Sequence, residues 1–220
     1  MKLVVRMSLT GLLALAPVAA VTVPALACGN SYRYEIDPKT NMIVRAEEAL
    51  HEGQLAQAAK LAQDATGIMG KSVEGQEDPA SLGALRARSL RVVAIAVVKS
   101  DGKLDLAVST PKGSDKADAN ISWAIAELRV LVAREPGNPY LQARLAQGLA
   151  HHVLTKNEAL QILAKLASDD LMPDAEAWQL LAQLQADASK PDERDKALEQ
   201  CKKRAADPAK TCVLKNPGDA

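Results

Sequence analysis

The sequence predicts an all-α protein, and three observations support this fold class. Alanine, the best helix former, provides 40 of the 220 residues. Five aromatic residues occur and phenylalanine is absent, so the core is expected to consist of Ala, Leu and Val side chains that let helices approach closely. Apolar residues recur at helical spacing along the chain, whereas the alternation typical of strands is almost entirely missing.

The N-terminal segment has the pattern of a bacterial export signal. MKLVVR carries two basic residues and no acid, and residues 7–27 are uncharged and largely apolar. A charged start, an apolar stretch and small residues at the end are typical of such a signal. A membrane-spanning helix is the alternative, but Pro17 and Pro24 would each interrupt it. We therefore expect residues 1–27 to be removed as a signal peptide.

Cys28 directly follows this segment, and two kinds of cleavage fit its position. An ordinary signal peptidase would cut after Ala27, and a lipoprotein signal peptidase would cut the same bond after Cys28 had received a lipid. The segment resembles a lipobox, although Leu26 lies one residue later than the usual leucine. Lipidation of Cys28 would leave Cys201 and Cys212 as an even pair in an oxidising compartment. An unmodified N-terminal cysteine is the alternative.

The predicted mature chain has 193 residues, of which 25 are basic and 27 are acidic. Its net charge near −2 gives no electrostatic attraction to nucleic acid, so no nucleic-acid partner is expected. The length suits one domain or one short repeat array. We expect a polar tether at 28–40, a helical array at 41–208 and a C-terminal tail at 209–220.

Helix-turn-helix units recur along the array. Residues 41–67 predict two helices that meet in a tight turn at Gly53. Six further helices are expected at 80–99, 117–135, 139–153, 158–169, 174–187 and 192–206. The stretch VVAIAVV at 92–98 is apolar on every side, which predicts a helix buried on all sides.

Equivalent alanines lie early in the second helix of each unit. They are Ala58, Ala124, Ala159 and Ala197. The last two intervals between them are 35 and 38 residues, and the first is 66 residues because two long loops, 67–79 and 100–116, interrupt that unit.

A helix-turn-helix unit with a period near 34 residues is the signature of the tetratricopeptide repeat, and the sequence resembles that family. EAWQLLAQL, with Trp178, Leu181 and Ala182, is similar to the first helix of the repeat, and DERDKALEQCKKRAADP is similar to the second. The resemblance implies a right-handed solenoid of about four repeats over 41–208. Its motifs are packing signals, so they indicate fold rather than chemistry. A generic alanine-rich helical bundle is the alternative.

The two C-terminal cysteines suit a disulfide staple. Cys201 lies in the last predicted helix, and Asp207-Pro208 lets the chain turn back before Cys212. A bond between them would tie the tail to a helix that has no following neighbour in the array. Two unpaired thiols are the alternative.

The sequence shows no catalytic constellation. Adjacent helical residues point in different directions, so His151 and His152 do not form a chelating pair and are expected at the surface. Asp169, Asp170 and Asp187 lie at helix ends, where acids cap helices or solvate turns. Phosphate loops, metal-spaced Cys/His clusters and serine elbows are absent from the sequence. We therefore expect a protein that is not an enzyme and needs no metal or cofactor.

The resemblance also implies a binding surface, because the first helix of each pair lines the concave, peptide-binding side of such arrays. These helices are expected at about 42–52, 80–99, 139–153 and 174–187. Their candidate inward polar residues are Arg45, Arg88, Arg91, Gln142, Arg144, Gln147, Gln179 and Gln183. Arginine and glutamine suit a peptide backbone or carboxylates. Ordinary solvated positions are the alternative, and the two long loops are the rival site.

These features lead to a functional hypothesis by fold analogy. We expect a non-enzymatic protein–protein interaction scaffold or adaptor of the bacterial cell envelope. It would lie in the periplasm or on the periplasmic face of the outer membrane and touch the membrane only through a lipid on Cys28. Gly29 is not the aspartate that retains many lipoproteins in the inner membrane, which favours the outer membrane. The alternative is a periplasmic assembly factor or chaperone for an exported client.

Overall fold

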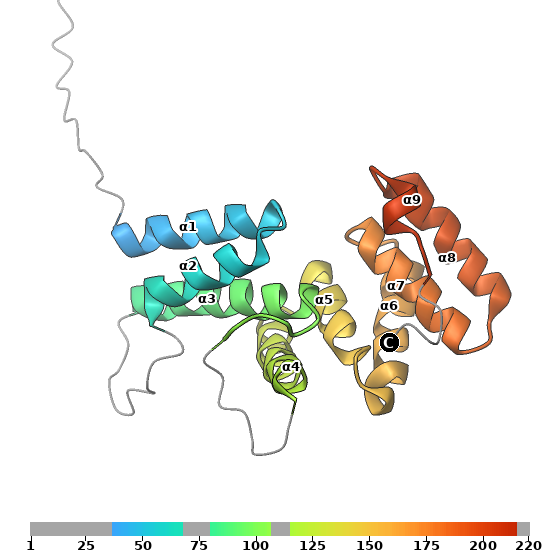
Figure 1. Cartoon of the computed structure of the whole chain (residues 1–220). Helices are drawn as coiled ribbons and strands as arrows, with labels where there is room; N and C mark the ends of the chain where they lie inside the picture. Colours follow the sequence, from blue (N-terminus) through green and yellow to red (C-terminus); the bar gives the residue numbers. More distant parts are fainter. Residues whose placement is uncertain (1–36, 68–79, 107–114, 215–220) are drawn as a thin grey trace, which may run out of the picture. The chain divides into compact units, whose positions relative to one another are not determined.

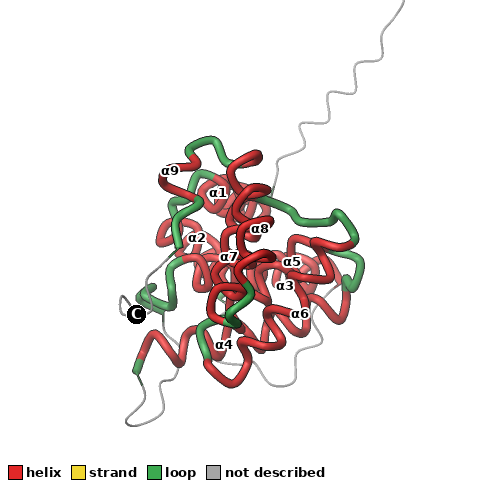
Figure 2. Tube along the Cα trace, turned by 90° about the vertical axis from the view of Figure 1, so that its right-hand side faces the viewer, coloured by secondary structure: helices red, strands yellow, loops and turns green. Residues whose placement is uncertain are grey.

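The computed structural model describes residues 37–67, 80–106 and 115–214, and these residues are helical and connected by turns and loops. No β-strand occurs in the described ranges, which confirms the all-α prediction for them (Figure 2). The helical elements, in chain order, are α1 (Pro38–His51), α2 (Leu55–Thr66), α3 (Ala80–Lys99), α4 (Lys116–Arg134), α5 (Pro139–Leu149), the 3₁₀ turn η1 (Val153–Thr155), α6 (Lys156–Ser168), α7 (Ala175–Asp187), α8 (Pro191–Arg204) and α9 (Pro208–Thr211). The expected signal peptide and Cys28 lie outside the described residues.

The helices pack as consecutive pairs, and a second set of contacts links alternate helices. Each of α1 to α8 packs against the next one along the chain (Figure 1). In addition α1 contacts α3, α3 contacts α5, and α5 contacts α7. Contacts of this extent do not link α2, α4, α6 and α8 to one another in the described part of the chain. The first helices α1, α3, α5 and α7 are therefore linked in a chain of contacts, and each second helix packs between two of them or, for α8, against the last.

The core consists mainly of small and branched aliphatic side chains. Every residue from Val92 to Val98 in α3 is at most 1% exposed, which confirms the prediction of a helix buried on all sides. The equivalent alanines of the second helices are all buried as well; they are Ala58, Ala124, Ala159 and Ala197. Because alanine leaves little side chain between the helix backbones, these positions let neighbouring helices approach closely.

Two expected boundaries differ from the structure at the ends of the array. Helix α1 begins at Pro38, inside the expected tether at 28–40, because Asp37 Oδ2 accepts the Thr40 N–H at 3.1 Å and proline suits the first helical position. The expected tail at 209–220 starts with the helical turn α9. Sequence periodicity located the amphipathic stretches, and the Asp37 cap with Pro38 decided where α1 begins.

Two turns depend on glycine in the left-handed region. Gly53 has φ +77° in the turn between α1 and α2, as expected for a tight helical hairpin. Gly102 has φ +73°, and a Cβ atom there would collide with the backbone of Ala117. The buried Asn120 side chain donates to the carbonyls of Gly102 at 2.8 Å and Leu104 at 2.9 Å. The described start of the 100–116 loop is therefore packed against α4.

The disulfide prediction agrees with the structure. Cys201 in α8 and Cys212 after α9 are joined, with a Cα–Cα distance of 5.9 Å, and both residues are buried. Helix α9 has one turn and no buried residue of its own, so it is too short to be stable alone. The bond attaches this turn and the following residues to α8, and α9 also contacts α7.

Candidate functional site

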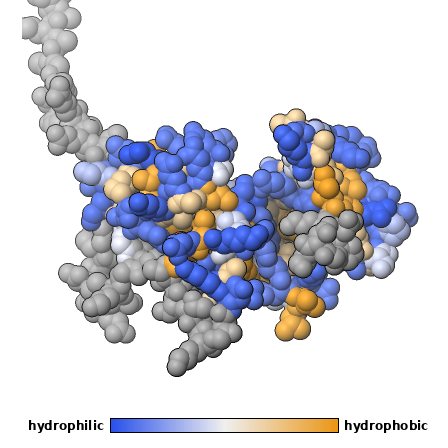
Figure 3. Space-filling view, in the orientation of Figure 1, coloured by the Kyte–Doolittle hydropathy of each residue, from blue (hydrophilic) through white to orange (hydrophobic). Residues whose placement is uncertain are grey.

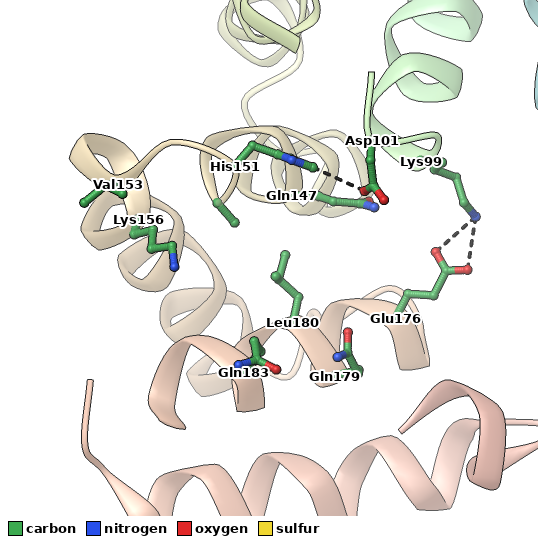
Figure 4. Close-up of a pocket in the computed structure, with 11 residues that line it drawn as sticks. Lys99, Asp101, Gln147, His151, Val153, Lys156, Glu176, Gln179, Leu180 and Gln183 are labelled. Carbon is green, nitrogen blue, oxygen red and sulfur yellow. Dashed lines mark hydrogen bonds and ion pairs between the residues drawn. The ribbon is translucent and has the colours of Figure 1, made fainter. Parts of the chain in front are cut away.

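The candidate site is a cavity of about 520 Å³ between the first helices of the last three pairs. Its walls come from the end of α3, the end of α5 with η1, the start of α6, and the exposed side of α7 (Figure 4). The lining residues are Lys99, Asp101, Gln147, Ala150, His151, Val153, Lys156, Glu176, Gln179, Leu180 and Gln183. Three of the eight residues proposed from sequence, Gln147, Gln179 and Gln183, belong to this set.

Three of the predicted arginines are engaged within the chain. Arg88 makes a two-point contact with Glu47 of α1, at 2.9 and 2.6 Å. That hydrogen bond raises the pKa of Arg88, and burial opposes the shift. Arg91 contacts Glu135 at the end of α4. These two side chains join helices rather than line the cavity.

Arg144 differs most from the sequence expectation, because its side chain is only 2% exposed. It contacts Asp174 and lies 3.1 Å from Glu176 Oε2, and its guanidinium stacks over the Tyr140 ring at 4.9 Å. Two carboxylates and an aromatic face satisfy the buried charge, as burial of an arginine requires. Arg144 therefore ties α5 to the start of α7 and is shielded from a partner.

The remaining predicted residues lie outside the cavity. Arg45 is exposed on α1. Gln142 donates to the Pro136 carbonyl just before its own helix. Sequence spacing placed both on first helices correctly, but it could not show which part of that layer is hollow.

Two ion pairs involve residues that line the cavity. Lys99 Nζ lies 3.0 Å from Glu176 Oε2, which joins α3 to α7, and Lys156 Nζ lies 2.9 Å from Asp187 Oδ2 (Figure 4 draws the first pair). Burial raises the pKa of Glu176, but hydrogen bonds and charge from Lys99 and Arg144 outweigh this effect and lower the pKa. Glu176 is therefore ionised at neutral pH and neutralises the cations around it.

The cavity has an aliphatic side. Leu180 points from α7 toward α5 in Figure 4, and Ala150 and Val153 complete this part of the wall. Val153 is 82% exposed and Leu154 beside it is 96% exposed. Figure 3 shows a hydrophobic projection at the turn between α5 and α6. Two highly exposed aliphatic side chains beside a polar cavity suit contact with a partner, and the sequence did not predict this role for them.

The C-terminal segment reaches the cavity through one hydrogen bond. Gln179 Nε2 donates to the Val213 carbonyl at 2.9 Å, and Leu214 packs against the core. Val213 follows the disulfide-bonded Cys212, so the staple positions the group that Gln179 contacts. The disulfide is in this way connected to a residue that lines the candidate site.

The helix-end acids and His151 lie as expected from sequence. His151 is exposed, with its Nε2 3.5 Å from Asp101 Oδ1, whereas His152 is half-buried. Asp169 pairs with Lys165 at 2.9 Å, and Asp170 takes a positive φ in the turn after α6. Within the described residues no group of His, Cys, Asp and Glu is arranged to hold a metal ion. None of the helices in these ranges combines the length and hydropathy needed to cross a membrane.

The rival site in the two long loops lies mostly outside the described residues, because residues 68–79 and 107–114 are not described.

The sequence did not predict Lys99, Lys156 and Leu180 as lining residues of the cavity. Leu180 is adjacent to the predicted Gln179, and a search for apolar residues between inward polar ones would have found it. Lys99 and Lys156 lie at helix ends, and only the tertiary packing brings them to the cavity.

The comparisons with known proteins add no family assignment. No protein-family model, no curated protein and no solved structure matches the chain significantly.

Proposed function

We propose that this chain is a non-enzymatic scaffold or adaptor that binds a protein partner in its first-helix cavity. The observation that carries the proposal is the lining of that cavity: three glutamine amides and an aliphatic wall, with its cations paired to carboxylates of the same chain. Amide groups both donate and accept hydrogen bonds, which suits a peptide segment. Such a surface recognises shape and main-chain groups.

We also propose that the helices form a right-handed solenoid of about four tetratricopeptide-like repeats. The pairs would be α1–α2, α3–α4, α5–α6 and α7–α8. Contacts between successive first helices support this arrangement, as do the buried alanines early in each second helix. In a stacked array each repeat contacts only its neighbours, which is the pattern of helix contacts described above.

The proposal places the protein in the bacterial cell envelope, in the periplasm or on the periplasmic face of the outer membrane. The apolar N-terminal segment before Cys28 and the Cys201–Cys212 disulfide both favour an exported protein. A lipid on Cys28 would anchor it, since two or more acyl chains give stable attachment. Intact mass tests this point: a diacyl or triacyl addition on residues 28–220 supports the anchor, and an unmodified cysteine contradicts it.

A chaperone or assembly factor for exported clients is the second candidate. The 96% exposure of Leu154 beside the cavity favours it, because exposed aliphatic groups suit unfolded segments. The number of partners separates the two functions. A scaffold gives one stoichiometric partner, and a chaperone gives many at low stoichiometry.

Site-specific photocrosslinking in the native cell tests the proposed surface. A photoreactive residue replaces Gln183, which lines the cavity, and a matched variant carries it at Gln161, an exposed glutamine of α6. The proposal predicts a defined crosslinked protein from position 183 and none from position 161. Crosslinks from position 161 alone, or from neither position, would contradict a partner in the cavity.

A further inference from the structure

The two glutamines that face each other across the cavity are held in opposite orientations by the rest of the chain. Gln147 comes from α5 and Gln179 from α7 (Figure 4). A glutamine amide has one accepting oxygen and one donating nitrogen, so a neighbour that engages one end leaves the other end for a ligand. Both glutamines have such a neighbour.

Arg144 sets the orientation of Gln147. Its Nη1 lies 2.7 Å from the Gln147 side-chain oxygen. A guanidinium only donates hydrogen bonds, so the Gln147 oxygen must face Arg144 and the Nε2 amide must face away. Arg144 is itself fixed by Asp174 and Glu176. The α5 wall therefore presents a hydrogen-bond donor.

The Val213 carbonyl sets the orientation of Gln179. It lies 2.9 Å from Gln179 Nε2, and a carbonyl only accepts. The Gln179 oxygen is then left for the cavity, and in Figure 4 it points from α7 toward the opposite wall. The Cys201–Cys212 disulfide holds the residue before Val213 against α8. The α7 wall therefore presents an acceptor.

The charged groups around the cavity already have partners within the chain. Lys99 pairs with Glu176 and Lys156 with Asp187, while Asp101 lies 3.9 Å from Lys103 Nζ and 3.5 Å from His151 Nε2. A charged ligand would have to compete with these intramolecular partners. An uncharged ligand that carries both a donor and an acceptor fits the two walls better.

We infer that the cavity recognises an uncharged peptide group, with its carbonyl on Gln147 Nε2 and its N–H on Gln179 Oε1. An adjacent aliphatic side chain packs on Leu180 and Val153, which line the same cavity. This inference rests on the proposed function, because it specifies the chemistry of the partner segment. It also makes Arg144 and Val213 positioning residues, since they act through the two glutamines.

A side-chain amide NMR titration of the full mature protein tests the inference. The probes are the tripeptide Ac-Ala-Leu-Ala-NH₂ and an analogue in which an ester replaces the amide after leucine, which removes one N–H. At about 10 mM probe the Gln147 and Gln179 amide signals should shift. The ester should bind about three- to tenfold more weakly, since it leaves the Gln179 oxygen without a donor.

The variant Gln147→Glu sharpens the test. Glutamate keeps an oxygen for Arg144 but replaces the donor that faces the cavity, so tripeptide affinity should fall about three- to tenfold. Gln161→Glu adds the same charge on α6 and should leave the affinity unchanged; thermal unfolding checks that both variants fold. Equal affinity for amide and ester, an unchanged affinity of Gln147→Glu, or an absence of shifts at both glutamines would overturn the inference.

The two proposals fail separately. A defined crosslinked partner from position 183, combined with equal binding of amide and ester, would leave the protein interface standing and remove amide recognition. The expected tripeptide pattern without any crosslinked protein would support amide recognition and contradict a protein partner in the cavity.

Discussion

Helix α3 and the C-terminal end of the chain are stabilised in different ways. In α3, residues 92–98 are fully buried by neighbours on every side. In α8 only Ala197 and Cys201 are buried, and the helix is held by a disulfide and by Arg204, whose guanidinium lies 5.2 Å from the Trp178 ring centroid. The interior helix is fixed by hydrocarbon packing, whereas α8 packs against α7 with few buried residues and adds a covalent and a polar contact.

The same contrast explains where the candidate site lies. The buried stretch of α3 offers hydrocarbon and no charged group, so it can support the array but has little to offer a ligand. The region around α5 and α7 is joined by Arg144, Glu176 and Lys99. These contacts hold the helices together and leave a polar cavity between them. The site is therefore found where polar contacts replace part of the hydrocarbon packing.

The largest loss of stability is expected from a substitution in the buried core of α3. Ile95 is 1% exposed in α3, so Ile95→Ala should lower the free energy of unfolding by about 3–4 kcal/mol through lost burial and a new cavity. Leu198 of α8 is only partly buried, and Leu198→Ala should cost about 1 kcal/mol. Urea unfolding measures both. Similar costs at the two positions would show that α8 is packed as an interior helix.

A smaller effect should follow from removing the disulfide. The bond closes a loop with a sequence separation of 11, so replacing Cys201 and Cys212 by alanine should cost about 2–3 kcal/mol. Hydrogen exchange should increase in α8 and α9, while α3 keeps its protection. A uniform increase over all helices would mean that the staple supports the whole array and not its end.

The smallest expected effect concerns the ion pairs at the cavity. The pKa of Glu176 is lowered in the folded state, so its contribution is complete above the pKa of the unfolded chain and is lost as the pH falls through the folded value. At pH 6 Glu176→Gln should be less stable than the natural protein by about 0.5 kcal/mol, because the Glu176 side chain is 48% exposed and solvent screens its charge. Chemical unfolding should show this difference shrinking once the pH falls below the ordinary glutamate pKa of about 4.3, and vanishing below the lowered folded pKa. A difference that persists at low pH would rule out the ion pair as its cause.

Most of the helical pattern could be predicted from the sequence. Helix α3 was expected at 80–99 and is observed at Ala80–Lys99, because a long apolar stretch dominates every local preference. The expected helix at 139–153 instead ends at Leu149, and the chain continues through η1 into α6. Apolar periodicity continues across that turn, so it could not reveal the break.

The site was predictable only in outline. The glutamines at 147, 179 and 183 were expected on the inward side of first helices, and they line the cavity. Arg144 was expected beside them as an available group, but it is buried against Asp174 and Glu176. Residue type and helical position indicate the face of a side chain, whereas its availability depends on partners about 30 positions away in the chain.

Hydrogen exchange of the mature protein with its crosslink-identified partner tests the central claim most directly. Partner binding should protect the end of α3, α5 and α7, which line the cavity, and leave α2, α4 and the exposed side of α6 unchanged. Protection confined to α2 and α4, with α5 and α7 unaffected, would contradict a binding surface on the first helices.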